Sequence, residues 1–450
     1  MKNFSTKSTV DAAMEMFERD ALGRNAEIAS FINLLDAIDE DDSCTIALNG
    51  DWGSGKTFFV KQTKLILDCY NDHSDLDEET RKKMQGVAES RGIERTKNYA
   101  TVYYDAWAND NAQDPILSLV HSILKANHKL VEPKNRKNVA NIFKSIVKSV
   151  KLNFEYFELD LKDILEGLEA DNLFEELLKE ENIKEKVKEF INSLIEERGN
   201  RLVIFVDELD RCKPAYAIQL LERIKHYFDD ERIIFVFSVN LGQLQHTVKG
   251  YYGAGFDATR YLDKFFDLRI SLPEINYEKY FNPGILSHWG LASDKQYELV
   301  CLTVIEHFKM PPRLVERYIS LVRIANGSGF WYKDKLAHRF AISYFVPVII
   351  GLSVTDLDTC KLFLKGQDPG PLQNMRINLD GAVHFLLGEK ENNNFDETIL
   401  RERLIEAYYA LFDRRNRNKV VGKMTFSNEI YESINKRISL LSAACKYNLE

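Results

Sequence analysis

A short glycine-rich stretch holds the residues of this chain that are best suited to chemistry. It matches the pattern G-x-x-x-x-G-K-[ST], in which backbone N–H groups at the start of a helix surround a phosphate. Three glycines in it are expected to adopt positive φ, which glycine tolerates without steric cost. The predicted phosphate-binding residues are Gly50, Asp51, Trp52, Gly53, Ser54, Gly55, Lys56, Thr57 and Phe58.

Two side chains of this stretch have distinct predicted roles. Lys56 is expected to reach the β and γ phosphates of a nucleoside triphosphate, and the hydroxyl of Thr57 is expected to bind Mg²⁺. The alternative is a chance occurrence of the pattern. Apolar residues 45–48 before the loop and residues 58–60 after it supply a strand and a helix, and this context favours nucleotide binding.

A second acidic motif follows a continuous apolar run in residues 202–206. A buried strand that ends in carboxylates is typical of a metal–phosphate site. We expect Asp207 to hold Mg²⁺ and Glu208 to polarise the attacking water as the catalytic base. The alternative is a buried strand that ends in a solvated acidic turn.

Three further polar residues are candidates for contacts with the nucleotide. Asn240 ends an apolar strand and is expected to orient the water or the γ phosphate, although it could instead cap a helix. Arg24 lies in a turn before the loop and is a candidate edge of the base pocket, or only part of a turn between helices. Arg313, near Arg317 and Arg323 on one helix face, is a candidate γ-phosphate sensor, with a solvated face as the alternative.

Composition places the chain among ordinary globular proteins. It has 450 residues, 45% of them hydrophobic, and a net charge of −9, which argues against nucleic-acid binding through bulk charge. A basic cluster at residues 414–423 leaves local nucleic-acid contact open. The 6 scattered cysteines, without a C-x-x-C pair, indicate reduced thiols in a cytoplasmic protein.

No targeting or membrane segment is expected. The first twenty residues contain no apolar core of a signal peptide. The longest apolar run, residues 340–354, is interrupted by Pro347 and is shorter than a membrane span requires, so we predict a buried helix or helix pair.

The pattern of apolar residues predicts an α/β fold with three layers and a mostly parallel sheet. Residues 99–104 have the aromatic and β-branched content of a strand, with Asp105 and Trp107 at its end as ligand contacts or, for Trp107, a cap on the core. The predicted domains are 1–112 and 200–273 for the core, 113–199 for a helical insertion, 274–335 for a helical lid and 336–450 for an all-helical C-terminal domain.

Several motifs together resemble the KAP family of P-loop NTPases. They span roughly residues 15 to 325 and are the turn at 20–24, GDWGSGKT at 50–57, YDAW at 104–107, FVDELDRCKP at 205–214, the strand that ends at Asn240, RYLDKFF at 260–266 and PPR at 311–313. The resemblance implies an additional-strand (ASCE) core, in which the strand that ends at Asn240 lies between the phosphate-loop strand and the strand that ends at Asp207. It also implies ATP or GTP hydrolysis, an insertion between the two motifs and a helical lid.

The sequence departs from the family pattern in two ways. Many members carry transmembrane helices in the insertion, and none is apparent here, so membrane attachment is not carried over. The second acidic position, often Asp in the family, is Glu208, which reaches further and makes hydrolysis more credible.

Three functions are compatible with these features. The leading hypothesis is an ATPase that acts as a nucleotide-driven switch in a bacterial complex, with a role in defence against phage that rests on family association alone. The second is a nucleotide-binding scaffold with little hydrolysis, and the third is an ATPase stimulated by nucleic acid. A protein partner or a homo-oligomer is expected, while ATP or GTP preference and an arginine finger in trans, such as Arg211, stay open.

Overall fold

The computed structural model describes most of the chain as two units. The described residues are 10–39, 42–94, 96–112, 114–126, 185, 187–192, 201–276, 295–327, 336–387, 396–416 and 419–442. Unit 1 comprises Met1–Asn276 and unit 2 comprises Tyr277–Glu450. The predicted boundary between core and lid, after residue 273, lies close to this division.

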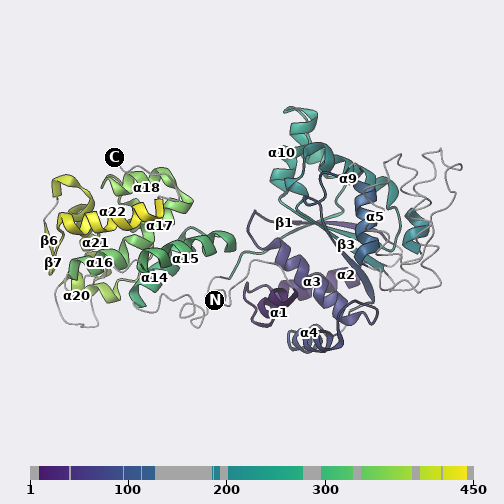
Figure 1. The fold of residues 1–450 in the computed structure, drawn as a ribbon, viewed down its shortest axis with the longest axis horizontal. Helices are drawn as coiled ribbons and strands as arrows, with labels where there is room; N and C mark the ends of the chain where they lie inside the picture. Colours follow the sequence, from purple (N-terminus) through teal and green to yellow (C-terminus); the bar gives the residue numbers. More distant parts are fainter. Residues whose placement is uncertain are drawn as a thin grey trace. The chain divides into compact units, whose positions relative to one another are not determined.

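Unit 1 is built around a parallel sheet (Figure 1). The strand order is β2-β3-β4-β1-β5, and all four pairings between neighbours are parallel. This order confirms the predicted additional strand, because β4 separates the phosphate-loop strand β1 from β3. The elements of unit 1 are α1 (Val10–Glu18), α2 (Asn25–Ala37), β1 (Cys44–Asn49), α3 (Lys56–Tyr70), α4 (Glu78–Ser90), β2 (Tyr99–Asp105), α5 (Pro115–Ala126), β3 (Arg201–Asp207), η3 (Leu209–Arg211), α9 (Pro214–Tyr227), β4 (Ile233–Val239), α10 (Leu241–Tyr252), α11 (Ala258–Leu262) and β5 (Leu268–Ser271).

Both faces of the sheet are buried at β3 and β4, which explains why these strands are mostly apolar. In β3, Leu202, Ile204 and Val206 pack with side chains of α5, α9, α10 and α11. Val203 and Phe205 point the other way, into a cluster formed with α1, α2, α3 and α4. The alternation along the strand therefore produces the three layers that the sequence predicts.

The register of the strands aligns their functional ends. Asp105 of β2 lies opposite Asp207 of β3, and Asp207 lies opposite Ser238 of β4. Asn49, the last residue of β1, lies opposite Val239. The ends of β1, β2, β3 and β4 therefore meet at one edge of the sheet, which is where ligands bind in open α/β sheets.

The described parts of the predicted insertion belong to the core of unit 1. At the start of the predicted insertion, α5 buries Ile116, Leu119 and Ile123. Near the end of the predicted insertion, Val187 and Phe190 are also buried. Both groups pack in the cluster on the α9 side of the sheet. The remainder of residues 113–199 lies outside the described residues, so the extent of an insertion stays a prediction.

Unit 2 is mostly helical (Figure 1). The predicted lid and C-terminal domain both fall within it, and α14 and α15 pack against α17. Its elements are α14 (Lys295–His307), α15 (Pro312–Gly327), α16 (Leu336–Tyr344), α17 (Val346–Thr355), α18 (Leu357–Leu364), α19 (Gly370–Asn374), η4 (Asp380–Ala382), α20 (Val383–Leu386), α21 (Glu397–Phe412), η5 (Arg414–Asn416), β6 (Val420–Val421), β7 (Met424–Thr425) and α22 (Asn428–Ser442).

The prediction of an all-helical C-terminal region is wrong in one place. β6 and β7 form an antiparallel hairpin joined by Gly422 and Lys423. Gly422 has a φ of 58° there, a conformation that tight hairpin turns demand and glycine supplies at little cost. Lys419 and Lys423, from the predicted basic cluster, are exposed at this hairpin, and nucleic-acid contact by the cluster stays a prediction.

The long apolar segment is a helix pair, as predicted. α16 and α17 meet at Phe345. The segment is longer than the sequence suggested, because α16 begins at Leu336, and by length and composition Leu336–Thr355 is the one segment in the described residues that could cross a membrane. Of its apolar window, 83% is buried inside the structure, as in the core helices of globular proteins.

One buried arginine ties the start of β3 to two loops. The guanidinium of Arg201, fully buried, donates to the carbonyls of Ile38 and Asp39 at 2.9 Å and to that of Glu231 at 3.0 Å. A fourth bond goes to the carbonyl of Asp42. A single guanidinium therefore joins the start of β3 to the carbonyls of two separate loops.

We predict that Arg201→Met lowers the free energy of unfolding by about 3 kcal/mol, because four hydrogen bonds from a buried side chain to two loops are lost, each contributing about 0.5–1.5 kcal/mol. Arg19→Met, which breaks an exposed ion pair with Glu15, is the control and should change stability by less than about 1 kcal/mol. Denaturant unfolding of both variants provides the measurement. An equal effect of the two substitutions would show that Arg201 does not brace β3.

Candidate nucleotide-binding site

The phosphate loop connects β1 to α3. Gly53 has a φ of 79° and Gly55 a φ of 91°, so both occupy the left-handed region that was predicted for them. Gly50 does not, and that prediction is wrong. Glycine is required at position 50 for space, because a Cβ there would lie 2.9 Å from the Ser54 Oγ and 3.3 Å from the Leu272 Cβ.

Lys56 lies inside the loop with only 8% of its surface exposed. Its Nζ donates to the carbonyls of Gly50 at 2.6 Å and Asp51 at 3.1 Å. Burial lowers the pKa of Lys56, while the nearby carboxylates, Asp210 first, oppose that shift. The ammonium group is thus held at the loop by carbonyl oxygens, and its contact with phosphates stays a prediction.

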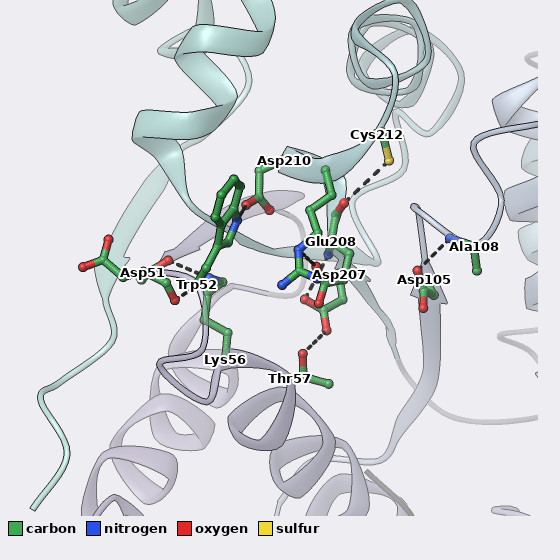
Figure 2. A network of polar contacts seen from close by, with 12 residues as sticks. Asp51, Trp52, Lys56, Thr57, Asp105, Ala108, Asp207, Glu208, Asp210 and Cys212 are labelled. Carbon is green, nitrogen blue, oxygen red and sulfur yellow. Dashed lines mark hydrogen bonds and ion pairs between the residues drawn. The ribbon is translucent and has the colours of Figure 1, made fainter. Parts of the chain in front are cut away.

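The predicted metal ligands Thr57 and Asp207 lie in contact (Figure 2). The Thr57 Oγ1 donates to the Asp207 Oδ2 at 2.7 Å, and the hydroxyl of Tyr103 donates to the same oxygen at 2.9 Å. The backbone N–H of Glu208 donates to the Asp207 Oδ1 at 3.0 Å. Both oxygens of this buried carboxylate are therefore oriented by donors from three segments.

This donor set fits Mg²⁺. The ion commonly takes one or two oxygen ligands from the protein and completes its shell with water and substrate phosphates. Among the described residues, no group of three or more His, Cys, Asp or Glu side chains could hold a metal ion. A hydroxyl and a carboxylate 2.7 Å apart, beside a phosphate loop, are compatible with Mg²⁺ bound together with a nucleotide.

Glu208, the candidate base, directly follows the end of β3. Its φ of 62° places a non-glycine residue in the left-handed region, where backbone strain is common at functional sites. Burial raises the pKa of Glu208 to about 7, and the negative charge of Asp207 adds to this effect. Arg211 acts in the opposite direction through an ion pair, with its Nε 2.5 Å from the Glu208 Oε2.

Asn240 caps a helix and also contacts the phosphate loop. Its Oδ1 accepts the backbone N–H of Gln243 at 3.1 Å, so Asn240 caps α10. Its Nδ2 donates to the Asp51 Oδ1 in the phosphate loop at 3.2 Å. The helix cap is thus present in the structure, and the placement next to the loop keeps the predicted contact with water or the γ phosphate as a proposal.

Arg24 is buried behind the loop, with 3% of its surface exposed. Its Nη1 donates to the Ser54 carbonyl at 2.7 Å, and its Nη2 donates to the Pro273 carbonyl after β5. The Nη1 lies 3.3 Å from the position that a Cβ on Gly55 would take. Arg24 therefore braces the loop, and contact with a base stays a prediction.

The other predicted residues differ in what the structure says of them. Phe58 is half-buried in the first turn of α3. Arg313 is exposed on α15 of unit 2, so its predicted role as a sensor stays a prediction. Asp105 accepts the Ala108 N–H at 2.9 Å, which closes the turn after β2. Trp107 is 53% exposed, so the alternative of a tryptophan that caps the core is wrong.

Sequence reasoning missed the contacts made by Tyr103, Asp210 and Arg211. The Trp52 Nε1 donates to the Asp210 Oδ2 at 2.5 Å, which links the phosphate loop to the turn after β3 (Figure 2). For Tyr103 the sequence did contain a signal. It lies two residues before Asp105, so alternation along the strand places both on the same face.

The strand order and the phosphate loop together define a P-loop NTPase fold of the additional-strand type. A sequence model of the KAP family P-loop domain matches residues 24–326. The chain therefore belongs to the KAP family, as its motifs suggested. Among curated proteins, none matches the chain in sequence.

Two of the solved structures that match this chain do so at low similarity. The Aeropyrum pernix ORC2 protein in ADPNP–ADP complexes is 12% identical, with 96% of this chain and 94% of that chain covered, at a TM-score of 0.30. The Aeropyrum pernix ORC1 protein in complex with DNA is 14% identical, with 93% and 83% covered, at a TM-score of 0.32. Likeness at this level carries no argument about function.

We predict that Tyr103→Phe raises the Mg²⁺ concentration needed for nucleotide binding about tenfold, because a hydrogen bond to a charged group contributes about 1.5–3 kcal/mol. Binding without Mg²⁺ should not change. Titrations of a fluorescent ATP analogue at graded Mg²⁺ provide the measurement.

Tyr104→Phe is the matched control, since Tyr104 is the next residue of β2 and its hydroxyl bonds to Ser118 of α5 and Tyr216 of α9, away from Asp207. This variant should keep the wild-type Mg²⁺ requirement. An unchanged Mg²⁺ requirement in Tyr103→Phe would mean that the tyrosine does not orient Asp207.

Proposed function

We propose that this protein hydrolyses ATP with Mg²⁺. The observation that carries the proposal is the convergence of Thr57, Asp207 and Glu208 beside the phosphate loop, from segments far apart in the sequence. A buried lysine in the loop and a carboxylate with a pKa near neutrality add the groups that phosphate binding and water activation require.

Each residue has a defined task in this proposal. Lys56 and the backbone N–H groups of the loop bind the phosphates, for which Lys56 exchanges its carbonyl partners for phosphate oxygens. Mg²⁺, when bound, offsets the negative charge of the phosphate oxygens. Thr57 and Asp207 would hold it. Glu208 accepts a proton from the attacking water, and Asn240 orients that water or the γ phosphate.

We further propose that hydrolysis drives a switch between states that recruit and release a protein partner or another copy of the chain. The five cysteines in the described part of the chain are free and buried, which supports a cytoplasmic location. The family resemblance supports a bacterial complex, and a role in defence against phage rests on that resemblance alone. Arg24 and Arg313 are proposed as nucleotide contacts on sequence grounds.

We predict that Glu208→Gln lowers ATP turnover by about 10²–10⁴-fold while ATP affinity stays within a few-fold of wild type, because the amide cannot accept the proton. Glu78→Gln, which alters an exposed glutamate paired with Lys82, is the control and should retain full turnover. Phosphate release and equilibrium binding provide the two measurements.

The outcomes separate the competing functions. Turnover that is unchanged in Glu208→Gln would remove Glu208 as the base. Background turnover in the wild type, combined with partner binding that Lys56→Ala abolishes, would favour the nucleotide-binding scaffold. Turnover that rises on addition of DNA or RNA would favour the ATPase stimulated by nucleic acid.

A further inference from the structure

The carboxylate of Glu208 is held by an arginine from the same turn. The Arg211 Nε lies 2.5 Å from the Glu208 Oε2, and both side chains are 22% exposed. Arg211 is the last residue of η3, three positions after Glu208. The backbone N–H of Arg211 also donates to the Glu208 carbonyl at 3.1 Å. Backbone and side chain of Arg211 therefore both contact the candidate base.

Two tryptophans hold the guanidinium of Arg211 in turn. Its Cζ lies 5.9 Å from the ring centroid of Trp52 and 5.7 Å from that of Trp107. These are cation–π distances, and tryptophan gives the strongest such contacts. Trp52 is 48% exposed and Trp107 is 53% exposed, so core packing does not explain either side chain.

One of these tryptophans belongs to the phosphate loop. Trp52 is fixed by its hydrogen bond to Asp210, a residue with 6% exposure next to Arg211. Trp107 comes from the turn after β2, beyond the end of the strand that lies next to β3. Elements on two sides of Arg211 thus determine where its guanidinium lies.

We propose that Arg211 is a positioning residue for Glu208, and that Trp52 and Trp107 form the clamp that keeps Arg211 in place. The role rests on the proposed hydrolysis. The side chain of Glu208, on a residue with left-handed backbone, could adopt several rotamers. The ion pair fixes the Oε2 of Glu208 against Arg211, so the other carboxylate oxygen points in a defined direction for water. Through Trp52, the position of the base depends on the conformation of the phosphate loop.

The test compares Arg211→Gln with Arg81→Gln in the full chain. Arg81 is a matched control, because it pairs with Asp72 at 3.5 Å and has 20% of its side chain exposed. We expect Arg211→Gln to lower kcat by about 10–100-fold, the scale of a misplaced reacting group, with the Kd for ATP within about threefold. The kcat of Arg81→Gln should match that of wild type. The kcat of Arg211→Lys should lie between those of wild type and Arg211→Gln, since lysine keeps the charge but lacks the planar guanidinium.

Double variants decide whether Arg211 acts through Glu208. In the Glu208→Gln background, Arg211→Gln should change the single-turnover rate by less than about twofold, since coupled residues are not additive. An equal loss in both backgrounds would overturn the proposal and would favour contact of Arg211 with a nucleotide, in cis or in another copy. Trp107→Ala should lower kcat, and its effect should disappear when Arg211 is already Gln.

The controls distinguish failure of this role from failure of the proposed function. No turnover in the wild type would overturn both. Turnover that depends on Glu208 but not on Arg211 would overturn this role alone. If Arg211→Gln does not fold, Trp107→Ala at a half-exposed position gives the same test, in which lowered kcat with unchanged Kd supports the clamp and wild-type kcat overturns it.

Discussion

The parallel pairing of β1 with β4, and of β4 with β3, fixes the position of the functional side chains of unit 1. Parallel strands end at the same edge of a sheet, so the loop after β1 and the acidic turn after β3 must meet there. The register is complete along these strands, and Asp207 lies level with Ser238 of the strand between. The hydrogen bond between Thr57 and Asp207, 150 positions apart in the sequence, is a consequence of that pairing.

The same edge of the sheet concentrates charged side chains that are largely buried. Burial disfavours the charged forms of both Lys56 and Glu208. It therefore lowers the pKa of the lysine and raises the pKa of the glutamate. Neighbouring charges limit the cost, since carboxylates surround the lysine and Arg211 pairs with the glutamate. The site therefore combines groups whose pKa values are shifted by burial with charged partners nearby, which is typical of functional sites.

The sequence predicted the parallel sheet, and it failed where conformation depends on packing. The place of β4 between β1 and β3 was predicted correctly because the family motifs imply it. Gly50 was assigned the wrong reason for being glycine, since neighbouring side chains rather than φ exclude a Cβ there. The C-terminal hairpin was missed because β6 and β7 have only two residues each, too few for a pattern.

What the sequence determined by itself is the phosphate loop, the buried strand that delivers Asp207 and Glu208, and the parallel α/β core. These follow from local patterns of glycine, charge and apolar residues. Only the tertiary structure decided that Tyr103 donates to Asp207, that Arg24 braces the loop, and that two tryptophans contact the arginine paired with Glu208. Such contacts join side chains from separate segments, so they depend on strand register and packing, which local patterns do not encode.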